Sequence, residues 1–360
     1  MTLRQFASGI ETVPATTSWY LADLAEARGK HELFTRQSPQ VLKVLREHAL
    51  IESVISSNRI EGVVVDQKRV GTIVFGRSHL RDRNEEEVRG YRDALKRVPE
   101  LGAKLPVSEA TMRELHRLSR GGVGDAGRYK LKDSDIIEKL RDGRVRIRFK
   151  TVSAAKTAAS MKETIRLWNE QLGGWQVHPL ILLAAMNLDF LCIHPFRDGN
   201  GRVSRLLLLL QCYHLGFEVG RYVSLERVIE ENKDRYYETL EQSSNHRHEG
   251  RHDPWPYINY VLFVLKTAYR EFEARAGQVK SPRGAKTALV EAAIAAFPAE
   301  FTLSDLERAA RASVRIWYGE SCGLFRRQSR LPVWGEAPVQ GGSERVLPPR
   351  EGNREGTAIW

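Results

Sequence analysis

One short segment of the chain, residues 194–205, gathers side chains that could together perform phosphate chemistry. It reads His-Pro-Phe-Arg-Asp-Gly-Asn-Gly-Arg-Val-Ser-Arg. His194 is the residue of the segment that can accept a proton near neutral pH, so it is a candidate base. Asp198 is a single carboxylate in a basic segment, and a Mg²⁺ ion held between it and phosphate oxygens would resolve that charge. The segment therefore predicts a base and a metal ligand beside a bound phosphate.

The glycines and arginines of the segment point to the same ligand. Gly199 and Gly201 allow backbone angles that side chains disfavour, so the amides around Asn200 can turn toward one point. Amides at the start of a helix carry a partial positive charge that suits an anion. Arg202 and Arg205 lie on one face of that helix, where cations oppose the helix dipole unless a polyanion is bound. We therefore expect these residues to hold phosphate groups.

Two apolar helices are expected to position the segment. Residues 182–193 and 203–215 carry apolar side chains at helical spacing, and residues 206–210 are apolar throughout. Pro195 ends the first helix near His194, because proline lacks the amide that a continuing helix needs. The segment is therefore predicted to form a short loop between two buried helices.

At every defined position the segment matches the signature of the Fic family, His-Pro-Phe-x-Asp/Glu-Gly-Asn-Gly-Arg-x-x-Arg. Proteins with this motif are mostly AMP transferases, in which the histidine deprotonates a Ser, Thr or Tyr hydroxyl that attacks the α-phosphate of ATP. The resemblance covers roughly residues 38–275. It implies a set of roles here: His194 as the catalytic base, Asp198 as the Mg²⁺ ligand, residues 199–201 as the phosphate nest, and Arg202 and Arg205 as phosphate clamps.

An amphipathic helix predicted over residues 40–61 carries a second resemblance. Gly62 supplies a left-handed cap after it, so Glu61 lies in the last turn, where the helix dipole disfavours a carboxylate by up to about 1 kcal/mol. The sequence SNRIEG around Glu61 matches the inhibitory motif Ser/Thr-x-x-x-Glu-Gly/Asn of Fic proteins. By this resemblance Ser57 and Glu61 belong to an inhibitory helix, and Glu61 pairs with Arg205 and keeps the γ-phosphate from binding productively.

Residues 134–140 and 145–151 give the clearest β signal of the chain, since they flank an Asp-Gly pair typical of a hairpin turn. The Fic resemblance makes this hairpin a flap that lies over the active site and docks a target segment by strand addition. The flap residues that the resemblance places against the nucleotide are Arg146, Ile147, Arg148 and Phe149. An alternative is that the cationic residues only protect a strand edge from aggregation.

Three residues after the motif resemble the adenine-side residues of the family, namely Tyr236, Tyr237 and Asn245. Tyrosine pairs are also common in helix packing, so a purely structural role stays open for them. The neighbouring His246, His248 and His252 follow at irregular spacing between arginines, which favours a solvated loop over a zinc site.

An acidic run opens another predicted helix, over residues 84–95. Glu85, Glu86 and Glu87 make one face acidic, while Val88, Tyr91 and Leu95 are its apolar positions. We expect a solvated helix with no chemistry of its own.

Composition narrows the class of protein. The chain has 360 residues, 42% of them hydrophobic, which is enough for a substantial core and for two or three domains. It shows no signal segment and no apolar stretch of about 18 residues, so we expect no membrane span. Cys192, Cys212 and Cys322 form no disulfide framework, which suits a cytoplasmic protein. The net charge of +11 is compatible with nucleic acid, with acidic protein surfaces or with solubility alone.

These features predict a mainly α fold: a Fic-type helical bundle with a β-hairpin flap and a C-terminal winged-helix-like remnant. The expected domains are an N-terminal arm (1–37), a region with the inhibitory helix (38–110), a catalytic core (111–275), a partial helix-turn-helix appendage (281–311) and an irregular tail (312–360). The tail has no sustained helical or alternating period, so we interpret it as disordered or as translated out of the ancestral reading frame.

The leading hypothesis is a cytoplasmic enzyme, inhibited by Glu61, that moves AMP from ATP to a Ser, Thr or Tyr hydroxyl of itself or of a target protein. One alternative is a DNA-binding regulator that uses the Fic core as a ligand sensor. Another is a Fic enzyme that removes AMP or transfers a different phosphate group. The intact motif favours AMP transfer, because a sensor has no need of His194 as a base, and the irregular tail weakens the case for DNA binding. A homodimer is possible, and no membrane partner is expected.

Overall fold

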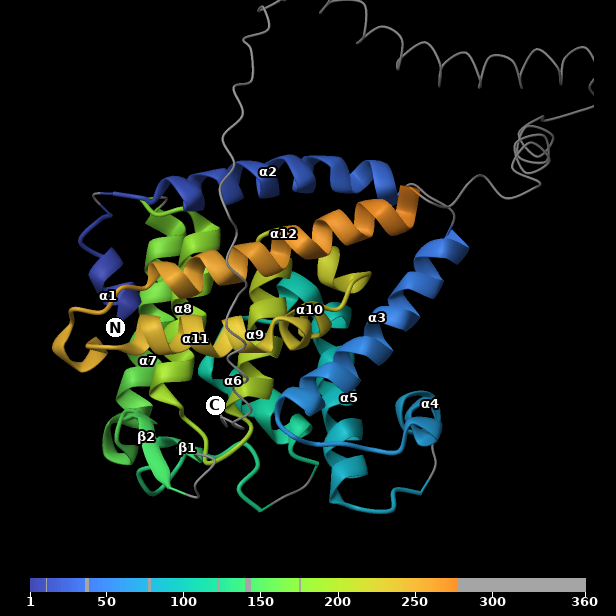
Figure 1. Cartoon of the computed structure of the whole chain (residues 1–360), viewed down its shortest axis with the longest axis horizontal. Coiled ribbons are helices and arrows are strands. Elements are labelled where there is room, and N and C mark those ends of the chain that lie inside the picture. The colour runs from blue at the N-terminus through green and yellow to red at the C-terminus, as the bar shows by residue number, and fades with distance from the viewer. Residues whose placement is uncertain are drawn as a thin grey trace, which may run out of the picture. The chain divides into compact units, whose positions relative to one another are not determined.

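In the computed structural model, two apolar helices pack against each other in the middle of the fold, α8 (Pro179–Ile193) and α9 (Asn200–His214) (Figure 1). Every residue of α8 after its first is buried, and α9 is buried as far as Tyr213. Helices that are buried on all sides form a core, and these are the two helices predicted around the motif. The loop that joins them, residues 194–199, holds the first half of the motif.

The structure describes residues 1–277 except residues 11, 36–38, 77–78, 122–123, 140–143 and 175. Over these residues the fold is mainly helical, as predicted. The remaining helices are α1 (Thr2–Phe6), α2 (Ala15–Thr35), α3 (Pro39–Ile60), α4 (Gln67–Phe75), α5 (Arg83–Leu101), α6 (Glu109–Ser119), α7 (Ala154–Gly174), α10 (Leu225–Glu231), α11 (Lys233–Ser244) and α12 (Trp255–Gly277), with the 3₁₀ turns η1 (Gly102–Lys104), η2 (Val219–Arg221) and η3 (Arg247–Glu249).

These helices enclose the central pair from several sides. Helices α7, α11 and α12 pack on α8, while α3, α5 and α6 pack on α9. Helix α2 runs along α12 at one end of the fold, and α3 descends beside α5 and α10 (Figure 1). Every helix in the described part of the chain falls short of the length and apolar character that a membrane crossing requires.

The predicted hairpin is confirmed as two antiparallel strands, β1 (Ile136–Lys139) and β2 (Val145–Phe149). Ile136 pairs with Phe149 and Ile137 with Ile147, with an irregularity between the first two β1 residues. Ile136 and Phe149 are buried, whereas Ile147 is 51% exposed. The hairpin is therefore anchored at one end and exposed toward the other. The Asp-Gly pair predicted for its turn lies outside the described residues.

The helix predicted over residues 40–61 is confirmed as α3, to within one residue at each end. Gly62 follows it with φ of +79°, the left-handed conformation predicted for its cap. Helix α3 packs on both α5 and α9. Its last turn lies beside the start of α9, where Arg205 donates a hydrogen bond to Ser57 O.

The expectation of a solvated helix over residues 84–95 is wrong. The residues form a helix, α5, but Glu85 and Glu87 on it are each only 4% exposed. Arg69 pairs with Glu85, and Arg202 donates to Glu87 at 2.7 Å. Buried carboxylates need such cationic partners, and here the partners come from distant parts of the chain.

The amino-terminal residues pack on the core. Helix α1 lies against α7 and α8, and the carboxylate of Asp189 accepts hydrogen bonds from the amides of Thr2 (2.8 Å) and Leu3 (2.9 Å). Cys192 and Cys212 are free and buried. The predicted appendage over 281–311, the predicted tail over 312–360 and Cys322 lie outside the described residues.

Candidate active site

Hydrogen bonds within the motif fix the loop between α8 and α9. His194 is the C-cap of α8, with φ of 53° and ψ of 61°, and its amide donates to Phe190 O (2.9 Å). The buried side chain of Asn200 joins the two sides of the loop: Nδ2 donates to Phe196 O (2.8 Å) and Oδ1 accepts from Phe196 N (2.9 Å). Gly199, with φ of 81°, is the N-cap of α9. The loop therefore holds the imidazole and the first amides of α9 in one fixed unit.

The imidazole of His194 is buried and uncharged at neutral pH. Burial lowers the pKa of His194 to about 4, and the nearby charge of Lys130 acts in the same direction. The left-handed backbone of His194 costs about 1–2 kcal/mol for a residue with a side chain, so its surroundings must hold it there. A neutral imidazole at this place can accept a proton.

Lys130, which sequence reasoning missed, ties the start of the hairpin segment to the motif loop. Its amide donates to Pro195 O (2.9 Å), and its Nζ donates to Thr151 Oγ1 (2.7 Å) and Ile193 O (3.2 Å). Burial lowers the pKa of Lys130 to about 8. Lys130 belongs to no motif recognised in the sequence, so only its contacts reveal its place beside His194.

Asp198 presents an ionised, half-exposed carboxylate at the edge of the loop. Its Oδ2 accepts from Arg120 Nη1 (2.6 Å) and its Oδ1 accepts from the amide of Gly199 (2.6 Å). Burial opposes ionisation, but the guanidiniums of Arg120 and Arg202 outweigh it and lower the pKa of this carboxyl. The described residues contain no cluster of three or more potential metal ligands. The single half-exposed carboxylate of Asp198 fits Mg²⁺, which commonly takes one carboxylate and completes its shell with water and phosphate oxygens.

Arg202, predicted as a phosphate clamp, is buried against α5. Its Nη1 donates to Glu87 Oε2 at 2.7 Å, and Glu87 Oε1 accepts from Arg120 Nη1 at 3.3 Å. Since Arg120 also binds Asp198, the four charged groups form one network behind the loop. Sequence reasoning missed Glu87 and Arg120, whose partners Arg202 and Asp198 lie 115 and 78 residues away along the chain.

His116 supports the same loop from α6. Its ring stacks on Phe196, with centroids 3.8 Å apart and planes at 6°. The amide of Gly127 donates to its Nδ1 (2.8 Å), so Nε2 carries the hydrogen and donates to Asp198 O (3.0 Å). Burial lowers the pKa of His116 to about 4. Sequence reasoning missed this residue too, because a lone histidine on an amphipathic helix carries no signal of its own.

Arg205 and Glu61, predicted to pair, form a buried ion pair. Arg205 Nη2 donates to Glu61 Oε1 at 2.8 Å, and the two side chains are 2% and 8% exposed. Arg205 also donates to Ser57 twice, from Nε to Oγ (2.9 Å) and from Nη2 to the carbonyl oxygen (3.0 Å). Burial opposes the charge of the guanidinium, but Glu61 outweighs it and raises the pKa of Arg205.

The carboxylate of Glu61 lies directly over the first turn of α9. A Cβ atom at Gly201 would stand 2.3 Å from Glu61 Oε1, closer than atoms can approach. The glycine thus gives the carboxylate its place beside the predicted phosphate nest. In this arrangement Glu61 Oε1 accepts the hydrogen bond of Arg205 Nη2 next to the first turn of α9.

Two of the predicted flap residues bind α11. Arg148 donates to Glu241 Oε2 from Nη2 (2.7 Å) and from Nε (3.2 Å), and Arg146 Nη2 donates to Glu241 Oε1 (3.3 Å). Phe149 is buried and stacks on His248, with centroids 5.5 Å apart. The predicted Ile147 is exposed on the hairpin. The hairpin is therefore held to α11 through Glu241.

The predicted adenine-side tyrosines lie between the hairpin and the end of α3. Tyr237 Oη donates to Ile60 O (3.5 Å), and Arg148 Nη2 donates to Tyr237 O (3.4 Å). Tyr236 is buried and packs on Tyr237, with ring centroids 5.2 Å apart. The structure therefore brings the hairpin, the tyrosine pair and the end of α3 into one continuous set of contacts.

Asn245 and the three following histidines lie at the far end of α11. Asn245 is exposed and caps α11 through its amide, which donates to Glu241 O (3.2 Å). The three histidines have separate partners: His246 the carboxylate of Glu249 (3.4 Å), His248 the carbonyl of Lys150 (2.6 Å) and His252 the hydroxyl of Thr2 (2.9 Å).

Comparison with known proteins identifies the family of the domain that contains this site. Residues 106–212 match the model of the Fic/DOC family. Among solved structures, the chain is similar to a Fic family protein from Desulfovibrio desulfuricans G20, with 23% identity, a TM-score of 0.59, and 83% of this chain and 84% of that one covered. A Fic domain containing signaling protein from Bacteroides thetaiotaomicron VPI-5482 matches with 21% identity, a TM-score of 0.60, and 71% and 97% coverage. A fragment of Fic-1 from C. elegans matches with 20% identity, a TM-score of 0.57, and 73% and 74% coverage.

The structural matches, all below 25% identity, show a shared fold, and the family model spans the motif loop together with α6, the hairpin, α8 and most of α9. Taken with the motif, these findings show that the chain carries a domain of the Fic/DOC family over residues 106–212.

Proposed function

We propose that this protein transfers AMP from ATP to a Ser, Thr or Tyr hydroxyl of itself or of a target protein. Fic-family members typically transfer AMP or other nucleotidyl groups to proteins. The observation that carries the proposal is the fixed loop between α8 and α9, which begins at an uncharged imidazole and ends at the glycine that opens α9. Such a loop joins a proton acceptor to an anion site within one rigid unit.

In the proposed reaction, His194 accepts the proton of the target hydroxyl as its oxygen attacks the α-phosphorus. A new phosphorus–oxygen bond forms, the bond to the oxygen that bridges the α- and β-phosphates breaks, and pyrophosphate leaves with that electron pair. The amides of residues 199–201 and the guanidinium of Arg205 would hold the phosphates in line for this displacement. When bound at Asp198, Mg²⁺ would neutralise phosphate charge.

We further propose that Glu61 inhibits this transfer. A phosphate that reaches Arg205 must displace a carboxylate held at 2.8 Å in a buried pair. The same carboxylate lies against Gly201, in the space next to the amides that would bind phosphate. Since both anions compete for one guanidinium, productive binding of ATP requires Glu61 to leave.

The test measures the transfer of label from an α-labelled nucleotide to protein. The purified Glu61→Gly protein is incubated with Mg²⁺ and each of the four α-labelled nucleotides in turn, both alone and with host lysate. We expect label from ATP on protein, and none from the Glu61→Gly/His194→Ala double variant, which should still bind ATP in calorimetry. Label from another nucleotide, or none from any, would refute AMP transfer. Loss of ATP binding in the double variant would show that His194 binds the nucleotide and is not the base.

A further inference from the structure

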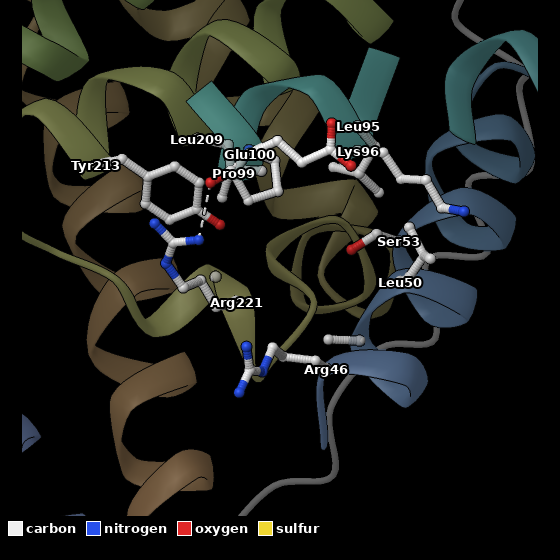
Figure 2. A pocket seen from close by; sticks show the side chains of 12 residues that line it. Arg46, Leu50, Ser53, Leu95, Lys96, Pro99, Glu100, Leu209, Tyr213 and Arg221 are labelled. Atoms are coloured by element: carbon white, nitrogen blue, oxygen red, sulfur yellow. Dashed lines mark hydrogen bonds between the residues drawn. The ribbon is translucent and has the colours of Figure 1, made fainter. Parts of the chain in front are cut away.

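A cavity of about 330 Å³ lies away from the motif loop, between α3, α5, α9 and η2 (Figure 2). Its volume falls in the range of small-molecule sites in proteins. Two of its walls are the helices next to the inhibitory pair, since Glu61 directly follows the last residue of α3 and α9 holds Arg205 in its second turn. Nothing in the proposed reaction uses this cavity.

The walls combine an apolar surface with cationic side chains. Ala49 and Leu50 on α3, together with Leu95 and Leu209 on the facing helices, give the apolar part. Arg46, Lys96 and Arg221 also line the cavity; Arg221 pairs with Glu218 (3.2 Å), and the one lining carboxylate, Glu100, is exposed. The excess of cations over carboxylates favours an anionic group, and the apolar wall favours a short hydrocarbon or aromatic body.

Tyr213 lines the cavity with its aromatic ring. Its side chain is 4% exposed, and its hydroxyl makes no hydrogen bond among the described residues. The guanidinium of Arg221 lies over the tyrosine ring, 4.7 Å from its centroid, and donates to Pro99 O (3.0 Å), which fixes this side of the cavity (Figure 2). The hydroxyl itself is closed off from the open space of the cavity, so a ligand here meets the ring of Tyr213 and the guanidinium of Arg221.

The cavity wall is linked to the position of α3. Ser53, which lines the cavity, donates to Glu226 Oε2 (2.7 Å), and Glu226 Oε1 accepts from Tyr91 Oη of α5 (2.8 Å). Ser53 lies about two helical turns before Glu61, and Leu209 about one turn after Arg205. A molecule between these walls would therefore contact both helices close to the inhibitory pair.

We propose that this cavity binds a small amphipathic anion, an acidic head on a short apolar body, and that the bound anion holds α3 where Glu61 pairs with Arg205. The cavity exists in the paired arrangement, and a ligand that binds one arrangement preferentially increases its population. The anion would thus act as an inhibitor remote from the nucleotide. This regulatory consequence rests on the proposed function, whereas binding itself does not.

Calorimetry on the full chain tests binding with three probes that share one tail: octanoate, octyl phosphate and octylammonium. We expect heat from one or both anions and none from the cation, and the comparison of octanoate with octyl phosphate identifies the preferred head group. Lys96→Glu should weaken binding by about tenfold or more, and Leu50→Trp should fill the space and weaken it as well. Lys162→Glu, an exposed charge reversal on α7, is the matched control and should bind like the wild type.

Absence of binding by both anions would overturn the proposal, and so would equal binding by octylammonium or unchanged binding in both cavity variants. Thermal unfolding of each variant verifies that it is folded, and the two cavity variants act on different features, charge and volume.

Hydrogen exchange of the segment 54–61 tests the coupling without any nucleotide. The bound anion should slow exchange there in the wild type and not in Lys96→Glu, while unchanged exchange on binding would overturn the regulatory part. If the anion binds and protects α3 but Glu61→Gly transfers no AMP, the proposed reaction fails and the ligand site stands. If Glu61→Gly transfers AMP and neither anion binds, the cavity proposal alone fails.

Discussion

Glu61 and Arg205 meet in a buried ion pair at 2.8 Å, although 144 residues separate them in the chain. The contact joins the residue that follows α3 to the second turn of α9, and Gly201 leaves room for it. Replacement of Glu61 should therefore change both the activity and the stability of the protein.

For activity, we expect automodification to rise about tenfold or more in Glu61→Gly, because both the charge and the bulk that occupy Arg205 are gone. Glu61→Gln keeps the bulk and loses the charge, so its rate should lie between those of the wild type and the glycine variant. Initial rates of label transfer from α-labelled ATP measure the series. Equal rates in all three proteins would contradict inhibition by Glu61.

For stability, Glu61→Gln leaves the buried guanidinium of Arg205 without its counter-charge. Breaking a buried ion pair on one side costs about 3–5 kcal/mol, here reduced because Ser57 still accepts hydrogen bonds from Arg205. Urea unfolding of the wild type and Glu61→Gln measures the loss. A double variant with Arg205→Met should recover part of it, and no recovery would mean that the pair does not act as a unit.

The pH dependence of transfer should report the lowered pKa of His194. The neutral imidazole is the base, and burial and Lys130 lower its pKa to about 4, so the rate should rise with pH through about 4 and stay level above pH 6. Removing the charge with Lys130→Met should move the midpoint upward, toward the ordinary value of 6.5. The rate is measured per folded molecule at each pH. A midpoint near 6.5 in the wild type would show that His194 is not buried in the active state.

Three buried histidines should make folding stability fall in mild acid. Burial lowers the pKa values of His116, His194 and His252 to about 4, from 6.5 in an unfolded chain. Between these values the unfolded state binds more protons, so stability is complete above about pH 6.5 and is lost as pH falls toward 4. At pH 5 each histidine contributes a loss on the order of 2 kcal/mol. Urea unfolding at pH 7 and pH 5 measures it. His252→Gln should reduce the difference, whereas the exposed control His246→Gln should leave it unchanged.

The network behind the motif loop should be sensitive to loss of Glu87. In Glu87→Ala the buried guanidinium of Arg202 loses its carboxylate, so we expect about 3–5 kcal/mol of destabilisation in urea unfolding. The matched control is Glu86→Ala, one residue away and exposed, which should stay within about 0.5 kcal/mol of the wild type. Similar effects for the two variants would remove the argument that Glu87 positions the loop.

Local patterns in the sequence predicted those features whose residues lie close together along the chain. The apolar spacing of α8 and α9, the loop at Pro195 and the left-handed Gly62 depend on neighbours within a few residues, and the structure contains each of them. The hairpin was predictable for the same reason, since its two strands are adjacent in sequence.

The polar network could not be predicted in this way. The acidic start of α5 has the pattern of a solvated helix, and only the arrival of Arg120 and Arg202 from other elements makes burial of Glu87 possible. His116 and Lys130 likewise become part of the site through the carbonyl oxygens of Asp198 and Ile193. Every residue carries a backbone carbonyl, so the sequence does not predict which carbonyl will accept a given hydrogen bond. Only the folded chain shows the contacts of these two residues.

The positive φ of His194 reverses the usual ranking of two substitutions. At most positions glycine is less stable than alanine by roughly 1 kcal/mol, because it loses more freedom on folding. At φ of 53° the order inverts: alanine meets the same clash as histidine, while glycine does not. His194→Gly should therefore unfold at higher urea than His194→Ala, although both lack the imidazole. Selection for stability alone would favour glycine at position 194. The histidine there therefore indicates a requirement other than folding.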